Sequence, residues 1–327
     1  MRTTPSLEPT PMPRLTPKLE PTTDETILQD VRLLVNQLWG LPAHKTHLPC
    51  PCPSSLSRQL LRDVVRKKEY FVAEKTNGVR MFMLFGAVEG GAEYCVLIDR
   101  AYNIYTVQCR ADPRLYQGTL LDGEMVPASL VYTVFDCYVA SGYSRFASPF
   151  FKRRQEYESI IRTVRWPFPL TVFAKQWHPL RHAATLWEER PLDGSLDGLI
   201  LQPKVGLPVT SGVQTDVFKW KPPEAHTIDF YLSATQDGWV LEVGSGPHIL
   251  SADRFGCYLG PVEPSVASRF PPEFQRLVVE CEFVGQNGNR YYFLPDKIRS
   301  DKLYANDAEV VKSTLAHMME GLLVSDF

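Results

Sequence analysis

Residues 70–85 read YFVAEKTNGVRMFMLF. Two apolar, β-prone runs flank Asn77-Gly78, the dipeptide that most strongly indicates a two-residue hairpin turn. The stretch therefore predicts two strands joined by a tight turn. It also puts Lys75 at the end of the first strand, so its amine is expected at the rim of a sheet rather than on a mobile loop.

The same alternation of apolar runs and breakers continues outward from this stretch. Short strands are predicted at 94–99, 104–107, 118–126 and 131–138. A helix is predicted at 151–164, between Pro149 and Pro167, and an amphipathic helix begins after Asp24. The pattern predicts an α+β domain built on antiparallel sheets.

The pattern changes after Pro222-Pro223. Short strands at 228–233, 238–243, 277–283 and 290–294, separated by glycine and proline turns, predict a small β-barrel. Apolar residues at helical spacing predict a last helix over 307–323 that packs on a domain. We therefore expect a disordered Pro/Thr-rich tail (1–24), a first domain (25–225), a barrel domain (226–306) and a C-terminal helix (307–327) that returns to the first domain.

Composition narrows the class of protein. The chain has 327 residues and a net charge of −2, which argues against a protein that coats nucleic acid by bulk electrostatics. The basic runs at 66–68 and 152–154 are typical of solvated helix faces. Apolar runs stay far shorter than the roughly eighteen residues of a membrane span. An odd number of scattered cysteines, seven, predicts reduced thiols in the nucleus or cytoplasm.

A lysine at a sheet rim is a candidate nucleophile. An amine attacks only when it is neutral, and burial or neighbouring cations favour the neutral form. We therefore expect further cationic side chains close to Lys75. The string Lys75-Thr76-Asn77-Gly78-Val79-Arg80 alone is a weak signal, because the Asn-Gly turn already explains part of it.

Further strings follow in one order, each combining an apolar strand with polar residues. They are Leu97-Ile98-Asp99-Arg100, Leu120-Leu121-Asp122-Gly123-Glu124, Val134-Phe135-Asp136, Leu196-Asp197-Gly198-Leu199-Ile200, Val217-Phe218-Lys219-Trp220-Lys221-Pro222-Pro223 and Arg299-Ser300-Asp301-Lys302. Each string alone is explained by an Asp-Gly turn or by an alternating strand with its lysines on a wet face. Together they supply the carboxylates and cations that hold ribose, triphosphate and a divalent metal around one amine.

Over residues 48–306 these collinear strings resemble the motifs of the covalent nucleotidyltransferases, the mRNA capping guanylyltransferases and ATP-dependent ligases. The string KWKPP, followed by Thr227-Ile228-Asp229-Phe230, is similar to the capping branch, as is Arg299 to Lys302 with Asn306 shortly after. The resemblance implies an ATP-grasp-like nucleotidyltransferase domain with antiparallel sheets and a C-terminal OB-fold barrel.

The resemblance also implies a role for each matching position. It implies catalytic roles for Lys75, Lys219, Lys221, Arg299 and Lys302, nucleotide contacts for Arg80, Arg100, Glu124, Phe135, Lys175, Ile200 and Asp301, and metal ligation by Asp197 and Asp229. Lys75 is expected to attack the α-phosphate of GTP, and Phe135 and Ile200 to sandwich the guanine. Lys175 matches only by approximate spacing.

The implied reaction transfers GMP through lysine–GMP to a 5′-diphosphate RNA end, with Mg²⁺ or Mn²⁺ as the metal. The tail is too short for an RNA triphosphatase, so this activity, the cap methyltransferase and RNA polymerase are expected on other chains. A nuclear location is implied, or the cytoplasm for a viral enzyme. Asn77 and Lys297 depart from the family's usual aspartate and arginine. A ligase that forms lysine–AMP, and a module that binds nucleotide or RNA without an adduct, remain alternatives.

Overall fold

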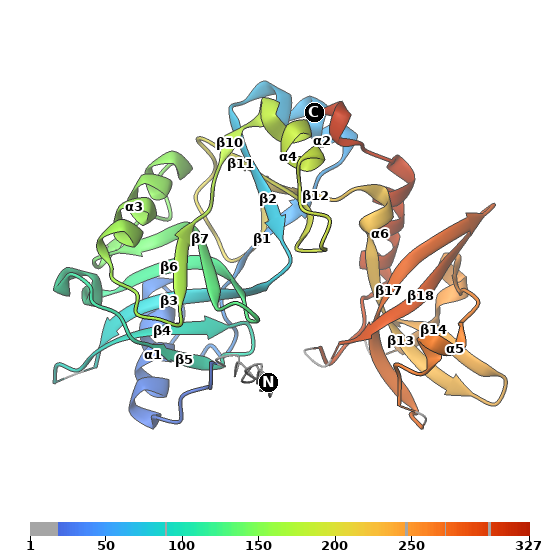
Figure 1. Ribbon diagram of the computed structural model, residues 1–327, viewed down its shortest axis with the longest axis horizontal. Helices are drawn as coiled ribbons and strands as arrows, with labels where there is room; N and C mark the ends of the chain where they lie inside the picture. Colours follow the sequence, from blue (N-terminus) through green and yellow to red (C-terminus); the bar gives the residue numbers. More distant parts are fainter. Residues whose placement is uncertain (1–18, 89, 246–247, 272, 300–301) are drawn as a thin grey trace, which may run out of the picture. The chain divides into compact units, whose positions relative to one another are not determined.

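The computed structural model describes residues 19–88, 90–245, 248–271, 273–299 and 302–327 (Figure 1). Most of the predicted tail, residues 1–18, lies outside this range. Contacts between residues divide the chain into two units, and each unit is assembled from separate stretches of sequence. The first unit contains 1–52, 77–176 and 204–213, and the second contains 53–76, 177–203 and 214–327. The predicted domain boundaries, including the one at 225/226, stay a prediction.

The first unit is built on a seven-stranded sheet. Its strands are β3 (Val79–Ala87), β4 (Glu93–Asp99), β5 (Ile104–Val107), β6 (Thr119–Val126), β7 (Val131–Ala140), β8 (Tyr143–Ser144) and β9 (Thr171–Ala174). The order is β5-β4-β3-β6-β7-β8 with antiparallel neighbours, while β9 runs parallel to β7. The strands predicted between 94 and 138 are therefore confirmed.

Helices cover both faces of this sheet (Figure 1). Helix α1 (Glu25–Leu38) shares a core with Phe82 and Leu84, while helix α3 (Phe150–Thr163) shares the opposite core with Met83 and Phe85. Successive β3 side chains point to opposite faces, so the continuous apolar run fills both cores. A 3₁₀ turn, η2 (Pro113–Gln117), completes the second core. Both predicted helices are confirmed.

The second unit contains most of a five-stranded sheet, two of whose strands begin with residues of the first unit. Its strands are β1 (Pro51–Ser55), β2 (Tyr70–Thr76), β10 (His178–Pro179), β11 (Leu196–Pro203) and β12 (Gly212–Trp220), in the order β1-β12-β11-β2-β10. Strand β11 is antiparallel to both of its neighbours. One face packs in a core with helices α2 (Arg58–Asp63) and α4 (Ala183–Glu188) and the 3₁₀ turn η1 (Val65–Lys67). The 3₁₀ turn η3 (Leu180–His182) leads into α4.

The predicted hairpin around Asn77-Gly78 is wrong. Strand β2 pairs with β10 and β11, whereas β3 pairs with β4 and β6, so the two strands belong to different sheets. Gly78 is needed for close approach rather than for a turn, because a Cβ there would lie 2.6 Å from the Met125 carbonyl oxygen. Its amide instead donates to Glu124 Oε1 at 3.1 Å. The dipeptide marks where the chain passes from one sheet to another.

The second unit also contains a six-stranded curled sheet. Its strands are β13 (Thr227–Thr235), β14 (Gly238–Ser245), β15 (His248–Ser251), β16 (Cys257–Leu259), β17 (Arg276–Asn287) and β18 (Arg290–Ile298), in the order β15-β14-β13-β17-β18-β16. The edge strand β16 is parallel to β18 and also contacts β14, so the sheet curls toward closure, as in an OB-fold barrel. The predicted barrel strands are confirmed. Short elements η4 (Pro223–Ala225), η5 (Ala252–Phe255) and α5 (Pro264–Ala267) connect them.

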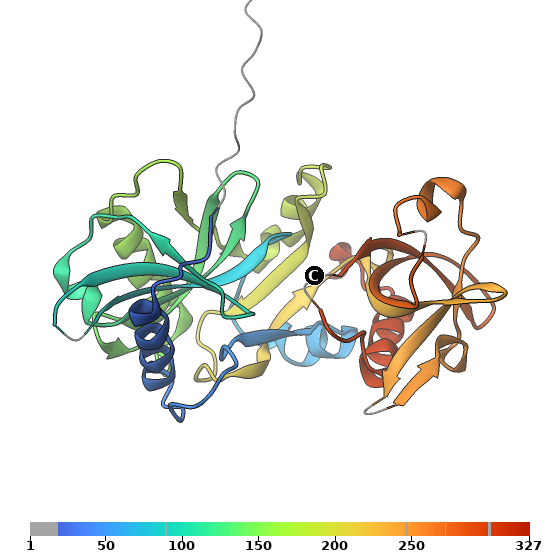
Figure 2. The same ribbon diagram turned by 90° about the horizontal axis from the view of Figure 1, so that it is seen from below.

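Helix α6 (Ala308–Glu320) lies against the barrel strands (Figures 1 and 2). Its apolar face, with Val311, Leu315 and Met318, joins the barrel core, and Gly321 ends it in the left-handed conformation. The following segment, with the 3₁₀ turn η6 (Val324–Asp326), packs on the core of the five-stranded sheet. Among all helices in the described ranges, none is long and apolar enough to span a membrane.

Candidate functional site

The five-stranded sheet has one core face and one face lined by predicted site residues. Val72, Leu199 and Trp220 point into the core, because Leu199 pairs with Trp220 and the strands alternate. The alternation turns the residues one position away to the other face. Those residues include Lys75, Ile200, Lys219 and Lys221, all partly buried. The sheet thus brings together three lysines from β2 and from the end of β12.

A β-bulge adds a carboxylate to this lysine face. Leu196 pairs with Thr76 and Gly198 with Lys75, so Asp197 is an extra residue in β11. Bulges re-aim side chains, and here the Asp197 carboxylate meets two ammonium groups. Lys75 Nζ lies 2.8 Å from Asp197 Oδ1, and Lys221 Nζ lies 2.7 Å from Oδ2. We call Lys75, Asp197 and Lys221 the sheet cluster.

The sheet cluster is charged and partly open to solvent. Burial opposes ionisation of Asp197, but the ammonium groups of Lys75 and Lys221 outweigh it and lower the pKa of this carboxyl. The side chains of Lys75, Asp197 and Lys221 keep 25%, 23% and 21% of their exposure. An anionic ligand can therefore reach the amines, and it would compete with Asp197 for them.

Gly198 lets β11 approach the end of β12 closely. A Cβ at this position would lie 2.1 Å from the Trp220 carbonyl oxygen, and that backbone atom cannot move aside without parting β11 from β12. The Asp197-Gly198 pair is therefore not a turn but part of a strand. The same is true of Asp122-Gly123 in β6, where a Cβ would lie 2.4 Å from the Tyr132 ring. Both turn explanations of these strings are wrong.

A second group of charges lies in the barrel. Buried Asp229, on β13, accepts from Arg299 Nη1 at 3.1 Å and forms an ion pair with Lys302 Nζ. The Arg299 guanidinium also bonds Glu280 Oε2 at 3.1 Å, and Lys297 bonds the same carboxylate at 3.2 Å. We call Asp229, Arg299 and Lys302 the barrel cluster. It unites three predicted residues, while predicted Asp301 lies outside the described residues.

Asn306 fixes the backbone of the barrel cluster. The Asp229 amide donates to Asn306 Oδ1 and the Asn306 amide to the Asp229 carbonyl, each at 2.8 Å. Within β17, Glu280 and Glu282 flank buried Cys281, so the barrel strand predicted at 277–283 is confirmed.

Predicted Arg80, in the first unit, is engaged within the protein. Its guanidinium bonds both oxygens of Asp122, with Nε to Oδ1 at 3.0 Å, and also donates to the Pro51 carbonyl. Asp122 is fully buried, and Tyr138 donates to its Oδ2 at 2.5 Å. Burial raises the pKa of the Asp122 carboxyl, although the Arg80 guanidinium opposes the shift. The role of Arg80 in nucleotide binding stays a prediction.

Predicted Phe135 and Lys175 occupy adjacent parts of the first unit's sheet. The Arg80 guanidinium carbon lies 5.5 Å from the centre of the Phe135 ring. The Lys175 amide bonds the Val134 carbonyl at 2.7 Å, because β9 runs parallel to β7 up to that point. Lys175 itself is buried. The sheet therefore gathers these three predicted nucleotide contacts within one unit.

An ion pair next to Phe135 was missed. Arg153, on α3, donates through Nε to Asp136 Oδ1 at 2.7 Å and through Nη2 to Oδ2 at 2.9 Å, and both residues are buried. The assignment of the 152–154 run to a solvated helix face is therefore wrong for Arg153. Its helical spacing could have found it, because Phe150 and Tyr157 are core residues on the same face.

Arg100 and Glu124 lie at the margins of the same sheet. Asp99 caps the loop that carries exposed Arg100, accepting from the amides of Ala101 and Asn103 at 2.9 Å each. Glu124 is opposite Arg80 in the antiparallel pair of β3 and β6 and accepts from the Gly78 amide. Their predicted contacts with nucleotide stay predictions.

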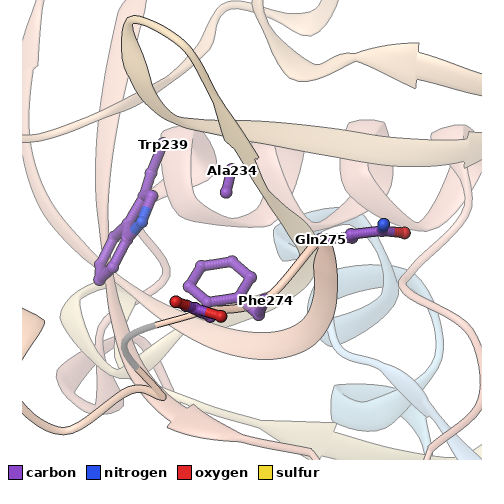
Figure 3. Close-up of a pocket in the computed structure, with 5 residues that line it drawn as sticks. Ala234, Trp239, Phe274 and Gln275 are labelled. Atoms are coloured by element: carbon purple, nitrogen blue, oxygen red, sulfur yellow. The ribbon is translucent and has the colours of Figure 1, made fainter.

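A separate hollow lies on the barrel, with a volume of about 520 Å³ (Figure 3). It is lined by Ala234, Trp239, Glu273, Phe274 and Gln275, where the rings of Trp239 and Phe274 are 5.4 Å apart. The lining is aromatic with one carboxylate and contains no predicted site residue. It therefore lacks the cations that a nucleotide phosphate needs.

Metal ligation was predicted at Asp197 and Asp229. Within the described ranges, no three or more His, Cys, Asp or Glu side chains group so as to hold a metal ion. Mg²⁺ is commonly bound by one or two carboxylates together with substrate phosphates, so Asp197 on its open face fits as a single ligand. Asp229 is buried and paired with two cations, so it fits a metal less well.

The charged groups of the second unit indicate the kind of ligand that it can bind. One sheet face carries two lysines paired with one carboxylate and a third lysine nearby on the strands, and the same unit contains a small barrel with an arginine–lysine cluster. Cations in this arrangement suit a phosphate-bearing ligand. A model of the mRNA capping enzyme catalytic domain matches residues 17–223. The chain belongs to the mRNA capping enzyme family.

Relatives agree with this membership. The chain is 30% identical to the mRNA-capping enzyme subunit alpha of Candida glabrata, over 63% of this chain and 53% of that protein. The same subunit of Schizosaccharomyces pombe is 28% identical over 91% of this chain and 83% of its own length. The chain spans about half the length of the Candida glabrata and Saccharomyces cerevisiae relatives.

A solved mycobacterial DNA ligase D, complexed with ATP and MES, aligns over 72% of this chain and 90% of its own, with 14% identity and a TM-score of 0.42.

Proposed function

We propose that the chain is a GTP:RNA guanylyltransferase. In the first step the Lys75 amine attacks the α-phosphorus of GTP. A nitrogen–phosphorus bond forms, the bond to the bridging oxygen of the β-phosphate breaks, pyrophosphate leaves, and the amine loses a proton. In the second step the terminal oxygen of a 5′-diphosphate RNA attacks the same phosphorus. The nitrogen–phosphorus bond breaks, the GpppN cap forms and the amine is regenerated.

The observation that carries this proposal is the sheet cluster. Asp197 holds the Lys75 amine at 2.8 Å and the Lys221 amine at 2.7 Å on one partly exposed face. In the proposed reaction, Lys221 and Lys219 bind the α-phosphate and neutralise the charge that develops on it. Asp197 orients the Lys75 amine until the α-phosphate replaces the carboxylate as the partner of the two amines. Membership of the capping enzyme family supports the same assignment.

The remaining predicted residues complete the proposed nucleotide site. Arg299 and Lys302 are assigned to the β- and γ-phosphates, together with Asp301. Phe135 and Ile200 are assigned to the two faces of the guanine, and Lys175 to its O6 atom. We assign the ribose and phosphate contacts to Arg80, Arg100 and Glu124. Arg100, which is exposed on its loop, is the freest of these three to turn toward a ligand.

A divalent Mg²⁺ or Mn²⁺ ion is part of the proposal. Asp197 would hold it together with the phosphate oxygens of GTP, because a single carboxylate with an open face suits such a site. When bound, the ion offsets negative charge on the triphosphate. Asp229 instead holds Arg299 and Lys302 in place for the phosphates.

The proposed substrates and partners follow from the reaction. The chain would take GTP and 5′-diphosphate RNA, and an RNA triphosphatase on another chain would supply the diphosphate end. A cap methyltransferase and RNA polymerase are proposed as further partners on separate chains. The nucleus is the proposed location, since mRNA is made there.

Labelling with α-³²P-GTP and Mg²⁺ or Mn²⁺ tests the proposal. We expect the protein to become labelled, to return the label as GTP when pyrophosphate is added, and to transfer the label to diphosphate RNA. Lys75→Ala and Lys75→Arg should not become labelled. Parallel labelling with α-³²P-ATP separates guanylyl transfer from a ligase reaction. An adduct with ATP alone, GTP binding without an adduct, or an adduct that persists in Lys75→Ala would each refute the proposal.

A further inference from the structure

Trp220, the last residue of β12, lies between Lys219 and Lys221 and points to the opposite side of the sheet. Lys219 and Lys221 face the cluster side, while the Trp220 indole is only 2% exposed in the core. A change in the position of this indole would therefore shift the end of β12, where Lys219 and Lys221 lie. The neighbours of Trp220 decide how firmly the lysines are held.

The indole is held by the segment Glu320–Phe327, which follows α6. Trp220 Nε1 donates to the Leu322 carbonyl at 2.8 Å, and this bond is buried. The Phe327 ring packs edge-on against the indole, with ring centres 5.6 Å apart. Trp187, on α4, packs edge-on at 5.1 Å. Two of the groups that fix Trp220 thus come from about 100 residues further along the chain.

Two arginines anchor this segment. Arg58 bonds the Glu320 carbonyl at 3.1 Å and the Gly321 carbonyl at 2.9 Å, and forms an ion pair with Asp326 at 3.0 Å. Its amide also donates to Glu320 Oε1 at 2.7 Å, and Arg66 donates to the Asp326 carbonyl at 2.6 Å. Arg58 and Arg66 therefore bind this segment, whereas arginines on a purely solvated helix face would extend into water. The arginines of α2 and η1 serve as clamps.

The same helix also touches the lysine strand directly. The Leu56 amide, just before α2, donates to the Lys219 carbonyl at 2.9 Å, and Ser57 caps the helix that carries Arg58. The segment therefore reaches the lysines by two routes. One passes through the Trp220 indole, and the other through Arg58 and the start of α2 to the Lys219 backbone.

We propose that the segment Glu320–Phe327 is a positioning element for Lys219 and Lys221, acting through Trp220 and Arg58. This inference rests on the proposed function, in which the two lysines bind the α-phosphate of GTP. The segment touches no reacting atom. It keeps the end of β12 in the geometry that puts Lys219 and Lys221 on the same sheet face as Lys75, and it makes the sheet cluster depend on a remote part of the chain.

The test uses the full chain and four variants. Phe327→Ala and Arg58→Met remove the ring and the clamp, while Phe327→Tyr keeps the ring. Arg62→Met is the matched control, because Arg62 lies on the same helix, is exposed, and forms its ion pair with neighbouring Asp63, at 3.2 Å. Single-turnover adduct formation is measured against GTP concentration, and the melting temperature of each variant is recorded. Assays are run well below the lowest melting temperature.

We expect Phe327→Ala and Arg58→Met to raise the half-saturating GTP concentration about fivefold to tenfold, the scale of one lost hydrogen bond or aromatic contact. The rate at saturating GTP should fall less, because Lys75 and its carboxylate remain. Phe327→Tyr and Arg62→Met should match the wild type. This split, with rescue by tyrosine, would not follow from loss of folded protein, which lowers the amplitude and leaves the half-saturating concentration unchanged.

The inference is overturned if folded Phe327→Ala and Arg58→Met have wild-type GTP dependence, or if Arg62→Met is affected equally. Both results presuppose a wild-type adduct. Failure of the wild type to form any adduct would instead refute the proposed function, so the two failures are distinguishable.

Discussion

Two carboxylates in this molecule are each paired with cations, and their surroundings are opposite. Asp122, paired with Arg80, has no exposed surface, and the arginine keeps only 14% of its own. Asp197, paired with Lys75 and Lys221, keeps 23%. Burial opposes ionisation at both carboxyls. It raises the pKa of Asp122 in spite of Arg80, whereas two ammonium groups lower the pKa of Asp197.

The difference separates a buried ion pair from one that is partly open to solvent. Arg80 and Asp122 are bonded at several atoms and further satisfied by Tyr138 and the Pro51 carbonyl. Removing one partner of such a buried pair is strongly destabilising, because the other charge is left buried without compensation. The sheet cluster has flexible lysines around one carboxylate on a partly open face, so a phosphate can replace Asp197 as their partner. Charge type alone does not reveal this distinction, but burial does.

The largest expected effect comes from breaking the buried pair. Asp122→Ala leaves the Arg80 guanidinium buried without its carboxylate, and we expect the free energy of unfolding to fall by about 3–5 kcal/mol. Urea unfolding followed by circular dichroism measures it. Asp197→Ala is the comparison and should cost about 1 kcal/mol or less, because its partners remain partly hydrated. Equal losses for the two variants would remove the distinction between the pairs.

The next prediction concerns the rate of adduct formation rather than stability, and here the important carboxylate is Asp197 instead of Asp122. Asp197→Asn keeps the shape but removes the charge that holds Lys75 and Lys221, so we expect adduct formation to slow by about 10²-fold. Stability should hardly change. Single-turnover labelling with GTP measures the rate, and urea unfolding checks the fold. A near wild-type rate in Asp197→Asn would show that the lysines do not depend on this carboxylate.

The elements of both units could largely be predicted from local pattern. The strands and helices around Phe82 and Val311 follow from apolar periodicity, which needs no knowledge of distant residues. The pairing of strands could not. Asn77-Gly78 is typical of a hairpin, yet Gly78 serves a close approach to Met125, a residue whose position depends on the whole sheet. The Asp-Gly strings failed for the same reason.

The resemblance assigns more residues to the candidate site than the sequence pattern does. The sequence order of the strings does not show that Asp197 bridges Lys75 and Lys221, because the bulge that aims it arises from strand pairing. Nor does it show the clamp between Arg58 and Glu320, which are separated by 262 positions. Long-range contacts of this kind have no local spacing signal. Arg153 was assigned to a solvated helix face because it lies between two other charged residues, Lys152 and Arg154.

The smallest effect at neutral pH concerns His226. It is a third titratable group to compare with Asp122 and Asp197, and its pKa responds to Lys221. Burial, followed by the positive charges of Lys221, His317 and Lys219, lowers the pKa of His226 from 6.5 to about 4. The folded protein therefore keeps this imidazole neutral where the unfolded chain already binds a proton. Stability from this group is complete above pH 6.5 and is lost as the pH falls toward 4.

His226→Gln should therefore lose less stability than the wild type between pH 6.5 and pH 4, by roughly 1 kcal/mol or more. Urea unfolding at intervals of pH measures the difference. Asp197 acts in a lower window, because a carboxyl whose pKa is lowered contributes stability until the pH falls below its ordinary range. Asp197→Asn should therefore keep the wild-type loss between pH 6.5 and pH 4 and differ only in stronger acid. If the wild type and His226→Gln have parallel profiles, the imidazole is not held neutral, and the positive field assigned to the lysines of β12 is weaker than their geometry implies.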